Sequence, residues 1–171
     1  VPFCSSTCDF CAFYQERPSK KKMESYFTGL QKEWKQANLA QPMDTVFVGG
    51  GTPGILQPDQ LERLCEFIKG MGLGEKVEWT VELAPNEVTE EKLSDLHKGG
   101  VNRISLGVQT FDAELMVALG RKHGPEKVFR AYDMIRETGF KSVNLDLIFG
   151  IPHQTLDQWD CLLYTSDAAD E

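Results

Sequence analysis

Short apolar segments and stretches with helical spacing alternate along this sequence, and the alternation limits the folds that it can adopt. Four runs rich in apolar residues predict buried strands, at residues 45–48, 77–81, 103–108 and 142–148. Stretches with helical spacing precede or separate them, at residues 23–37, 58–69, 89–97 and 125–137. Parallel strands need crossover connections, which helices usually supply. We therefore expect an α/β fold with a parallel sheet.

Local signals place several helix ends. Asp59 and Thr89 are the candidate N-terminal caps, because short polar side chains accept hydrogen bonds from the free N–H groups of a first turn. Glycines are expected to stop three of the helices, at Gly70, Gly99 and Gly139.

Glycines and polar residues gather where the strands are predicted to end. Residues 49–53 follow the first strand, Glu82 and Gln109 close the next two, and Asp146 lies near the end of the fourth. In (β/α) barrels the active site is built at the carboxyl ends of the strands. The sequence therefore predicts that these residues share one site.

Three of the five cysteines, Cys4, Cys8 and Cys11, lie close together with the spacing C-x3-C-x2-C. No fourth nearby Cys or His completes a tetrahedral zinc site. A four-iron cluster normally takes four cysteines, so three would leave one iron open to a substrate. A partial zinc knuckle and free thiols are the alternatives. Cys65 differs from the trio, since it lies among apolar residues of a predicted helix and is expected to be a buried thiol.

The composition is that of one globular domain. The 171 residues are 41% hydrophobic and 26% charged, and no apolar run approaches the length of about 18 residues that a membrane span requires. A net charge of −8 disfavours nucleic-acid binding, which usually depends on a basic patch. Clustered thiols favour a reducing compartment, so we expect a cytoplasmic protein.

The cysteine spacing, with Phe10 directly before Cys11, resembles the cluster motif of the radical SAM superfamily. Further segments, taken in order, are similar to those of the oxygen-independent coproporphyrinogen III oxidase family, which includes the heme chaperones; they are residues 48–53, 81–85, 102–109, 120–123 and 144–152. The resemblance runs from Val1 to about Trp159. It implies that residues 1–160 form a partial (β/α)6 radical SAM barrel, truncated at both ends.

The resemblance also implies the cofactors and their ligands. Cys4, Cys8 and Cys11 would hold a [4Fe–4S] cluster whose open iron binds S-adenosylmethionine. The family positions that contact this cofactor are matched by Phe10, Gly50, Gly51, Thr52, Glu82, Gln109, Arg121 and Asp146. A structural ion pair is the alternative role for the charged members, because an unpaired buried charge is costly. His123 and His153 receive no role, and Phe13 is expected in the core.

The implied chemistry begins when an electron donor protein reduces the cluster and an electron enters the sulfonium, which yields a 5′-deoxyadenosyl radical. In the oxidase that radical abstracts hydrogen from a propionate of coproporphyrinogen III, which loses carbon dioxide and becomes a vinyl group. The oxidase usually has a cysteine two positions after the third cluster cysteine, where this chain has Phe13. The resemblance therefore favours the heme chaperone branch, with heme or a porphyrinogen as ligand and the oxidase as the alternative. A noncatalytic metal-bound module accounts poorly for the four polar cofactor positions.

The last eleven residues, 161–171, break the family pattern. They can be encoded by a DNA sequence that resembles a transposase adapter used in sequencing libraries. We therefore expect the natural sequence to end near Asp160 and residues 161–171 to be a non-native tail. Because the chain begins almost at the cysteine loop, we also expect an upstream segment and most of a first strand to be missing.

Overall fold

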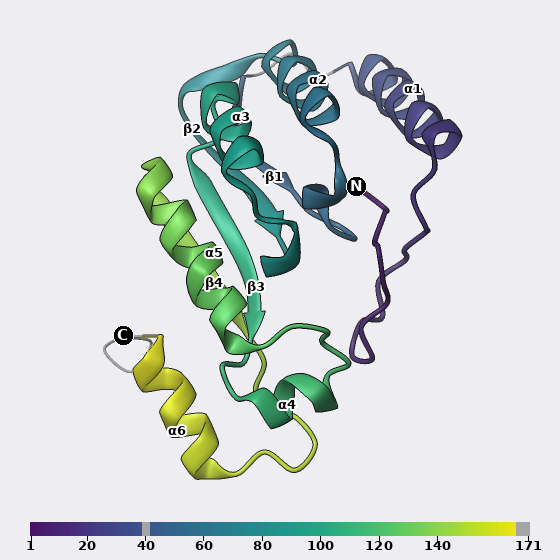
Figure 1. Ribbon diagram of the computed structural model, residues 1–171. Helices are drawn as coiled ribbons and strands as arrows, with labels where there is room; N and C mark the ends of the chain where they lie inside the picture. Colours follow the sequence, from purple (N-terminus) through teal and green to yellow (C-terminus); the bar gives the residue numbers. More distant parts are fainter. Residues whose placement is uncertain (39–41, 167–171) are drawn as a thin grey trace.

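The computed structural model describes residues 1–38 and 42–166 and shows an α/β architecture (Figure 1). Four parallel strands form one sheet in the order of the sequence: β1 (Met43–Val48), β2 (Leu73–Leu83), β3 (Arg103–Gln109) and β4 (Ser142–Leu147). The helices are α1 (Lys20–Ala37), α2 (Pro58–Lys69), α3 (Glu90–Gly99), α4 (Ala113–Ala118), α5 (Pro125–Thr138) and α6 (Leu156–Thr165), with short 3-10 helices η1 (Pro53–Ile55) and η2 (Pro85–Glu87). The predicted alternation is confirmed.

Helices α2, α3 and α5 cover one face of the sheet, whereas α4 and α6 lie beyond the ends of the strands (Figure 1). Helix α3 packs between α2 and α5 across this face (Figure 1). Side chains of a strand alternate between the two faces, and on β3 the fully buried Ile104, Leu106 and Val108 belong to the core shared with the helices. Ser105 and Gln109 therefore lie on the opposite face. That face carries the polar residues from which the site is built.

The helix starts show one correct and one wrong cap prediction. Thr89 caps α3, because its hydroxyl accepts a hydrogen bond from the Lys92 N–H at 3.3 Å. Asp59 does not cap α2 but lies in its first turn, and Gln57 occupies the cap position. The start is displaced because Pro58 has the fixed φ of a first helical residue and no N–H to satisfy.

The predicted glycine stops are close to the observed helix ends. Gly70 and Gly139 follow the last residues of α2 and α5. Helix α3 ends at Gly99 and is capped by Gly100, whose φ of +101° is the left-handed conformation that a glycine adopts without strain.

Two helices were not predicted from the sequence. Helix α4 has six residues, too few for a recognisable period, and depends on Asp112, whose carboxylate accepts from the Leu115 N–H at 2.9 Å. Helix α6 continues past Asp160, which was the expected end of the natural sequence. Any sequence of suitable residues can form a helix, so α6 does not test whether residues 161–171 are a non-native tail, and this stays a prediction. Residues 167–171 lie outside the described residues. Within the described ranges, no helix is long and apolar enough to cross a membrane.

The N-terminal segment runs along the end of β1. The Gly51 N–H donates to the Val1 carbonyl at 2.8 Å, and the Thr52 N–H donates to the Phe3 carbonyl at 2.9 Å. Phe3, which is 3% exposed, also forms a parallel bridge with Glu16. These contacts bring both ends of the cysteine loop to the carboxyl edge of the sheet.

Candidate functional site

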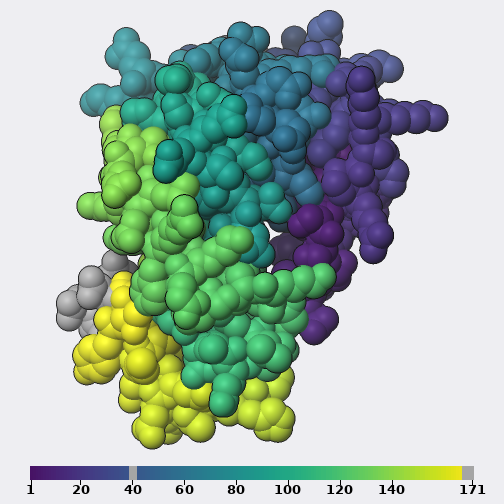
Figure 2. Space-filling model, in the orientation of Figure 1, coloured from purple at the N-terminus to yellow at the C-terminus, as the bar shows by residue number. Residues whose placement is uncertain are grey.

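A cavity of about 380 Å³ lies at the carboxyl edge of the sheet, and every predicted site residue lines it. Figure 2 shows the surface hollowed where the purple N-terminal residues meet the teal and green segments. The lining includes Cys4, Cys8, Phe10, Cys11, Gly50, Gly51, Thr52, Glu82, Gln109, Arg121 and Asp146. These residues come from the cysteine loop, the ends of all four strands and the segment after α4. The volume is within the range of about 300–1,000 Å³ that is typical of small-molecule sites.

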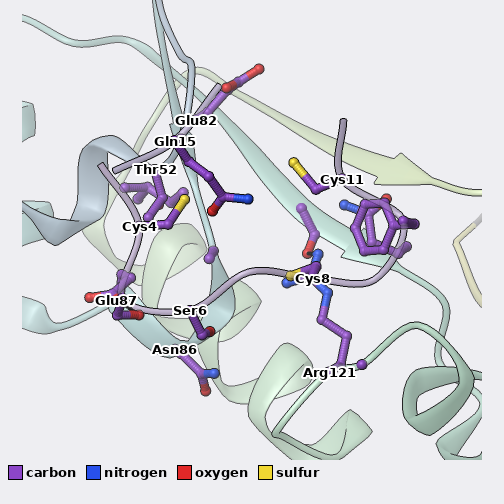
Figure 3. A pocket seen from close by; sticks show the side chains of 18 of the residues that line it. Cys4, Ser6, Cys8, Cys11, Gln15, Thr52, Glu82, Asn86, Glu87 and Arg121 are labelled. Atoms are coloured by element: carbon purple, nitrogen blue, oxygen red, sulfur yellow. Dashed lines mark hydrogen bonds between the residues drawn. The ribbon is translucent and has the colours of Figure 1, made fainter. Parts of the chain in front are cut away.

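The three cysteine thiols lie on two sides of the cavity. Figure 3 shows Cys4 on the side that carries Thr52 and Glu87, with Cys8 and Cys11 on the other side. In residues 1–38 and 42–166, no three His, Cys, Asp or Glu side chains converge to hold a single metal ion. A structural zinc site needs its ligands around one ion, whereas a four-iron cluster distributes its thiolates among several irons. Thiols on two sides of one cavity could therefore bind separate irons of a cluster.

The electrostatics of the Cys4, Cys8 and Cys11 thiols also favour binding of a cationic group. Burial raises the pKa of Cys4, and the neighbouring Cys11 and Cys8 raise it further. Three thiolates would repel one another across the cavity, and metal cations remove this repulsion by binding them. The donor set is therefore suited to an iron–sulfur cluster.

The glycine run after β1 allows protein groups to approach closely. A Cβ on Gly49 would lie 2.7 Å from the carboxyl carbon of Glu82, and a Cβ on Gly51 would lie 2.5 Å from the Phe3 carbonyl oxygen. Gly50 has a φ of +119°, which side chains rarely permit. The run thus brings Glu82 and the N-terminal segment against the strand end, while Gly50 and Gly51 also line the cavity.

Glu82 is held at the cavity by the glycine run. Its Oε2 accepts a hydrogen bond from the Gly50 N–H at 3.1 Å. Burial raises the pKa of Glu82, the Gly50 hydrogen bond opposes that increase, and nearby Asp146 adds to it.

Asp146 belongs to a polar network on the face of the sheet opposite the helices. The Ser105 hydroxyl lies 3.0 Å from both carboxylate oxygens, and the Asn144 amide donates to Oδ1 at 2.6 Å. Among the described side chains, neither Asp146 nor Glu82 forms an ion pair. The alternative of a structural ion pair is therefore not found there. The Val1 ammonium acts to lower the pKa of Glu82 but forms no salt bridge with it. Two carboxylates without a salt-bridge partner among the described residues make this side of the cavity suitable for a positively charged ligand.

Arg121 connects the sheet with the cysteine loop. Its Nη2 donates to the Gly107 carbonyl at 3.2 Å, and its guanidinium carbon lies 5.5 Å from the centroid of the Phe10 ring. Its Nε is buried and has no partner. Burial lowers the pKa of Arg121, while Cys8 and Cys11 act in the opposite direction. The free N–H can donate to an anionic group of a ligand.

Gln109 has an unusual backbone conformation at the end of β3. Its φ is +71°, and the pairing of β3 with β4 shifts register between Gly107 and Gln109. A left-handed non-glycine residue stores of order 1–3 kcal/mol of strain. The bulge changes the direction of the chain at Gln109, at the edge of the cavity. A Cβ on Gly107 would lie 3.1 Å from the side-chain amide nitrogen of Gln109, so the glycine leaves room for this side chain.

His123, which received no role from the sequence, also lines the cavity. Its Nδ1 lies 3.3 Å from the Gly124 carbonyl, and its Nε2 is buried without a partner. Burial lowers the pKa of His123, so the neutral ring is favoured. In the sequence, the motif at residues 120–123 indicated that His123 lies close to Arg121. His123 received no role because a lone histidine is more often structural.

The prediction that Phe13 lies in the core is wrong. Its side chain is 75% exposed and borders the cavity, because the cysteine loop lies at the edge of the sheet and away from the helix-covered face. Polar lining residues in the cysteine loop, in η2 and after α4 were not identified from the sequence, because these short segments have no periodicity to reveal them; they are Ser5, Ser6, Gln15, Asn86, Glu87 and Lys122.

Comparisons with known proteins identify the family of the chain. The chain is 36% identical over 175 residues to the heme chaperone HemW of Bacillus subtilis, covering 99% of this chain and 46% of that protein. It is 37% identical over 161 residues to the oxygen-independent coproporphyrinogen III oxidase of Paracoccus denitrificans, covering 90% of this chain and 36% of that protein. The chain therefore spans less than half the length of these two relatives.

The structure of coproporphyrinogen III oxidase (HemN) from Escherichia coli superposes with a TM-score of 0.86 at 30% identity, covering 97% of this chain and 39% of that one. Methylornithine synthase (PylB) has the same fold at a TM-score of 0.71 and 15% identity, covering 99% of this chain and 48% of that one. The four-stranded sheet thus corresponds to part of a (β/α)6 radical SAM barrel. The sequence profile of the Radical SAM superfamily matches residues 1–163, and the chain belongs to that superfamily.

Proposed function

We propose that this chain forms the cofactor-binding core of a radical SAM protein of the heme chaperone type. Cys4, Cys8 and Cys11 hold a [4Fe–4S] cluster, and S-adenosylmethionine occupies the adjoining cavity. The observation that carries the proposal is that all eleven residues implied by the family motifs line one cavity. Heme or a porphyrinogen is the proposed small-molecule ligand, and an electron donor protein is the proposed partner.

The charges of the cavity match those of S-adenosylmethionine, which carries a sulfonium, an ammonium and a carboxylate. Glu82 and Asp146 form no ion pair among the described residues and provide negative charge for the cationic groups. The unpartnered Nε of Arg121 can donate to an anionic one. The buried Thr52 hydroxyl also has no partner, so it can hydrogen-bond to a ligand.

The protein contributes orientation and exclusion of water. When bound, the cluster and S-adenosylmethionine supply one-electron reductive cleavage of a carbon–sulfur bond. Ser105 and Asn144 fix the Asp146 carboxylate before a ligand arrives, so its reorganisation on binding is small. On the loop side of the cavity, the Phe10 ring packs over the Arg121 guanidinium, whose carbon lies 5.5 Å from the ring centroid.

Phe13 favours the chaperone branch over the oxidase. It borders the cavity at the position where the oxidase usually has a further cysteine. The sequence identities do not separate the branches, since they are 36% to the B. subtilis chaperone and 37% to the P. denitrificans oxidase. The similarity to the E. coli oxidase structure supports the oxidase as the second candidate.

Anaerobic reconstitution with iron and sulfide tests the cofactor assignment. We expect about four irons per chain, with electron paramagnetic resonance spectra that change when S-adenosylmethionine is added. Replacing Cys4, Cys8 or Cys11 by Ala should abolish this signal. The matched control is Cys65→Ala, since Cys65 is 3% exposed in α2 and burial raises its pKa to about 11. Stoichiometric zinc in place of iron would contradict the proposal.

An anaerobic assay of the complete gene product with coproporphyrinogen III separates the two branches. The chaperone proposal predicts heme binding and no protoporphyrinogen IX. Formation of protoporphyrinogen IX together with methionine and 5′-deoxyadenosine would identify the oxidase instead.

A further inference from the structure

Backbone hydrogen bonds attach the cysteine loop to the rest of the molecule at two separate places, and next to Cys4 the exposed Ser5 hydroxyl also donates to the Glu87 carboxylate at 3.2 Å. We propose that residues 119–121, here called the α4 turn, position Cys8 and Cys11 independently of Cys4, and that Gly120 is the positioning residue. The consequence for cluster assembly rests on the proposed function, whereas the attachment itself can be tested without a metal.

The first attachment holds the base of the loop and Cys4. The Cys4 N–H donates to the Glu16 carbonyl at 3.1 Å, and the Glu16 N–H donates to the Pro2 carbonyl at 2.8 Å. Phe3, directly before Cys4, is buried in the core. Cys4 is therefore fixed by the N-terminal segment and the end of β1.

The second attachment holds the far part of the loop. The Asp9 N–H donates to the Leu119 carbonyl at 3.3 Å, and the Phe10 ring packs against the Arg121 guanidinium at 5.5 Å. Asp9 and Phe10 lie between Cys8 and Cys11, so these two contacts act directly on the second and third thiols. Figure 3 shows Cys8 and Cys11 on the Arg121 side of the cavity, apart from Cys4.

Gly120 allows this approach for two reasons. Its φ is +70°, a conformation that side chains rarely adopt. A Cβ at this position would also lie 2.5 Å from Oδ2 and 2.8 Å from Cγ of Asp9. An Ala at position 120 therefore has to displace the Asp9 carboxylate. We expect part of this displacement to reach the Asp9 backbone, whose N–H is bonded to Leu119, and thus the part of the loop between Cys8 and Cys11.

The matched control is Gly139, which follows α5. It has a similar φ of +89°, but no atom lies within 4 Å of the position that its Cβ would occupy. Gly139→Ala therefore carries the backbone strain without the collision with Asp9. The difference between Gly120→Ala and Gly139→Ala isolates the contact with the loop.

The test measures the alkylation rate of each thiol. The 171-residue chain is reduced and treated with a chelator, then alkylated, and mass spectrometry of its peptides reports the extent of alkylation at each cysteine. We expect Gly120→Ala to accelerate alkylation of Cys8 and Cys11 about three- to tenfold, as loss of a hydrogen bond and a cation–π contact predicts. Alkylation of Cys4 should keep its wild-type rate, and Gly139→Ala should leave all three rates unchanged. Buried Cys65 reports global unfolding and should stay protected.

Removal of the Asp9 carboxylate provides a second test. The double variant Asp9→Ala/Gly120→Ala should return the Cys8 and Cys11 rates to those of Gly139→Ala. The inference would be overturned if Gly120→Ala accelerated alkylation of Cys4 as much as that of Cys8 and Cys11, or if it exposed Cys65. It would also be overturned if Gly120→Ala and Gly139→Ala had equal rates, or if the double variant showed no rescue.

Anaerobic iron loading of the same variants separates this inference from the proposed function. Gly120→Ala should load iron more slowly than Gly139→Ala. If the wild type binds no iron while the alkylation pattern holds, the proposed function fails and the two attachments stand.

Discussion

The two sides of the cavity are built in different ways. On the sheet side, Asp146 accepts hydrogen bonds from Ser105 and Asn144, and β3 behind it carries fully buried side chains. On the loop side, Phe10 is 40% exposed and Phe13 is 75% exposed, and a few hydrogen bonds and one ring contact attach the loop. The sheet side is therefore arranged by folding itself, whereas the loop side depends on local contacts and on the proposed cluster. This difference implies that substitutions on the two sides have separable effects.

The largest expected effect tests whether stability resides in the sheet. Ile104 is 0% exposed at the centre of the sheet, so Ile104→Ala should lower the free energy of unfolding by about 2–5 kcal/mol through lost burial and a cavity. Phe13→Ala on the exposed loop should change it by less than about 0.5 kcal/mol. Chemical denaturation of the two variants measures both values. Equal losses would show that the loop side is as integral to the fold as the sheet.

The second prediction concerns binding rather than folding. Asp146→Asn and Arg121→Lys keep the size of the side chain but remove a charge or the fork geometry. Each should weaken S-adenosylmethionine binding by about 1.5–3 kcal/mol, the usual range for a hydrogen bond to a charged group. Calorimetric titration of the reconstituted protein measures the affinity. Loss of folding with unchanged affinity would assign both residues to the scaffold.

A smaller effect is expected from the residue that orients Asp146. Ser105→Ala removes a hydroxyl donor from both Asp146 oxygens and should reduce S-adenosylmethionine affinity by about 0.5–1.5 kcal/mol. Ser142→Ala, on the same strand as Asp146 but exposed at its start, is the control and should bind like the wild type. If both variants bind equally, preorganisation of Asp146 contributes nothing measurable.

The smallest predicted effect is an opposite pH response on the two sides. Burial raises the pKa of Glu82, so the folded state holds that proton more tightly, and stability should decline as pH rises from the ordinary glutamate pKa to the raised one. Lys22 and Tyr14 lower the pKa of Glu16 on the loop side, so its contribution should be lost as pH falls through the lowered pKa. Glu82→Gln and Glu16→Gln should each remove one slope from a denaturation series over pH. Slopes of the same sign would contradict the comparison.

The sequence predicted the sheet side more completely than the loop side. Apolar runs predicted the strands and placed Glu82, Gln109 and Asp146 at or near their ends, and parallel strands then bring such residues to one edge. Ser105 and Asn144 were not identified as the partners of Asp146, because strand register determines that contact.

The loop side was less predictable because it depends on long-range contacts. Phe13 was expected in the core and is exposed, since composition does not reveal how far a loop stands from the helix-covered face. Helix α4 was missed because six residues carry no clear period, and with it the attachment of Asp9 to Leu119. The motif around Arg121 indicated a role for this segment but not its contact with Phe10.

The attachment of Asp9 to Leu119 has a consequence during protein synthesis. The two residues are about 110 positions apart, and a ribosome adding about 5–20 residues per second needs roughly 5–20 s to make the intervening chain. In that interval Cys8 and Cys11 have been translated, but the turn that holds them does not yet exist. A nascent chain thus presents reactive thiols to oxidants and stray metals before its cavity can form. A reducing environment around the ribosome would matter more for this protein than for one whose ligands follow its scaffold.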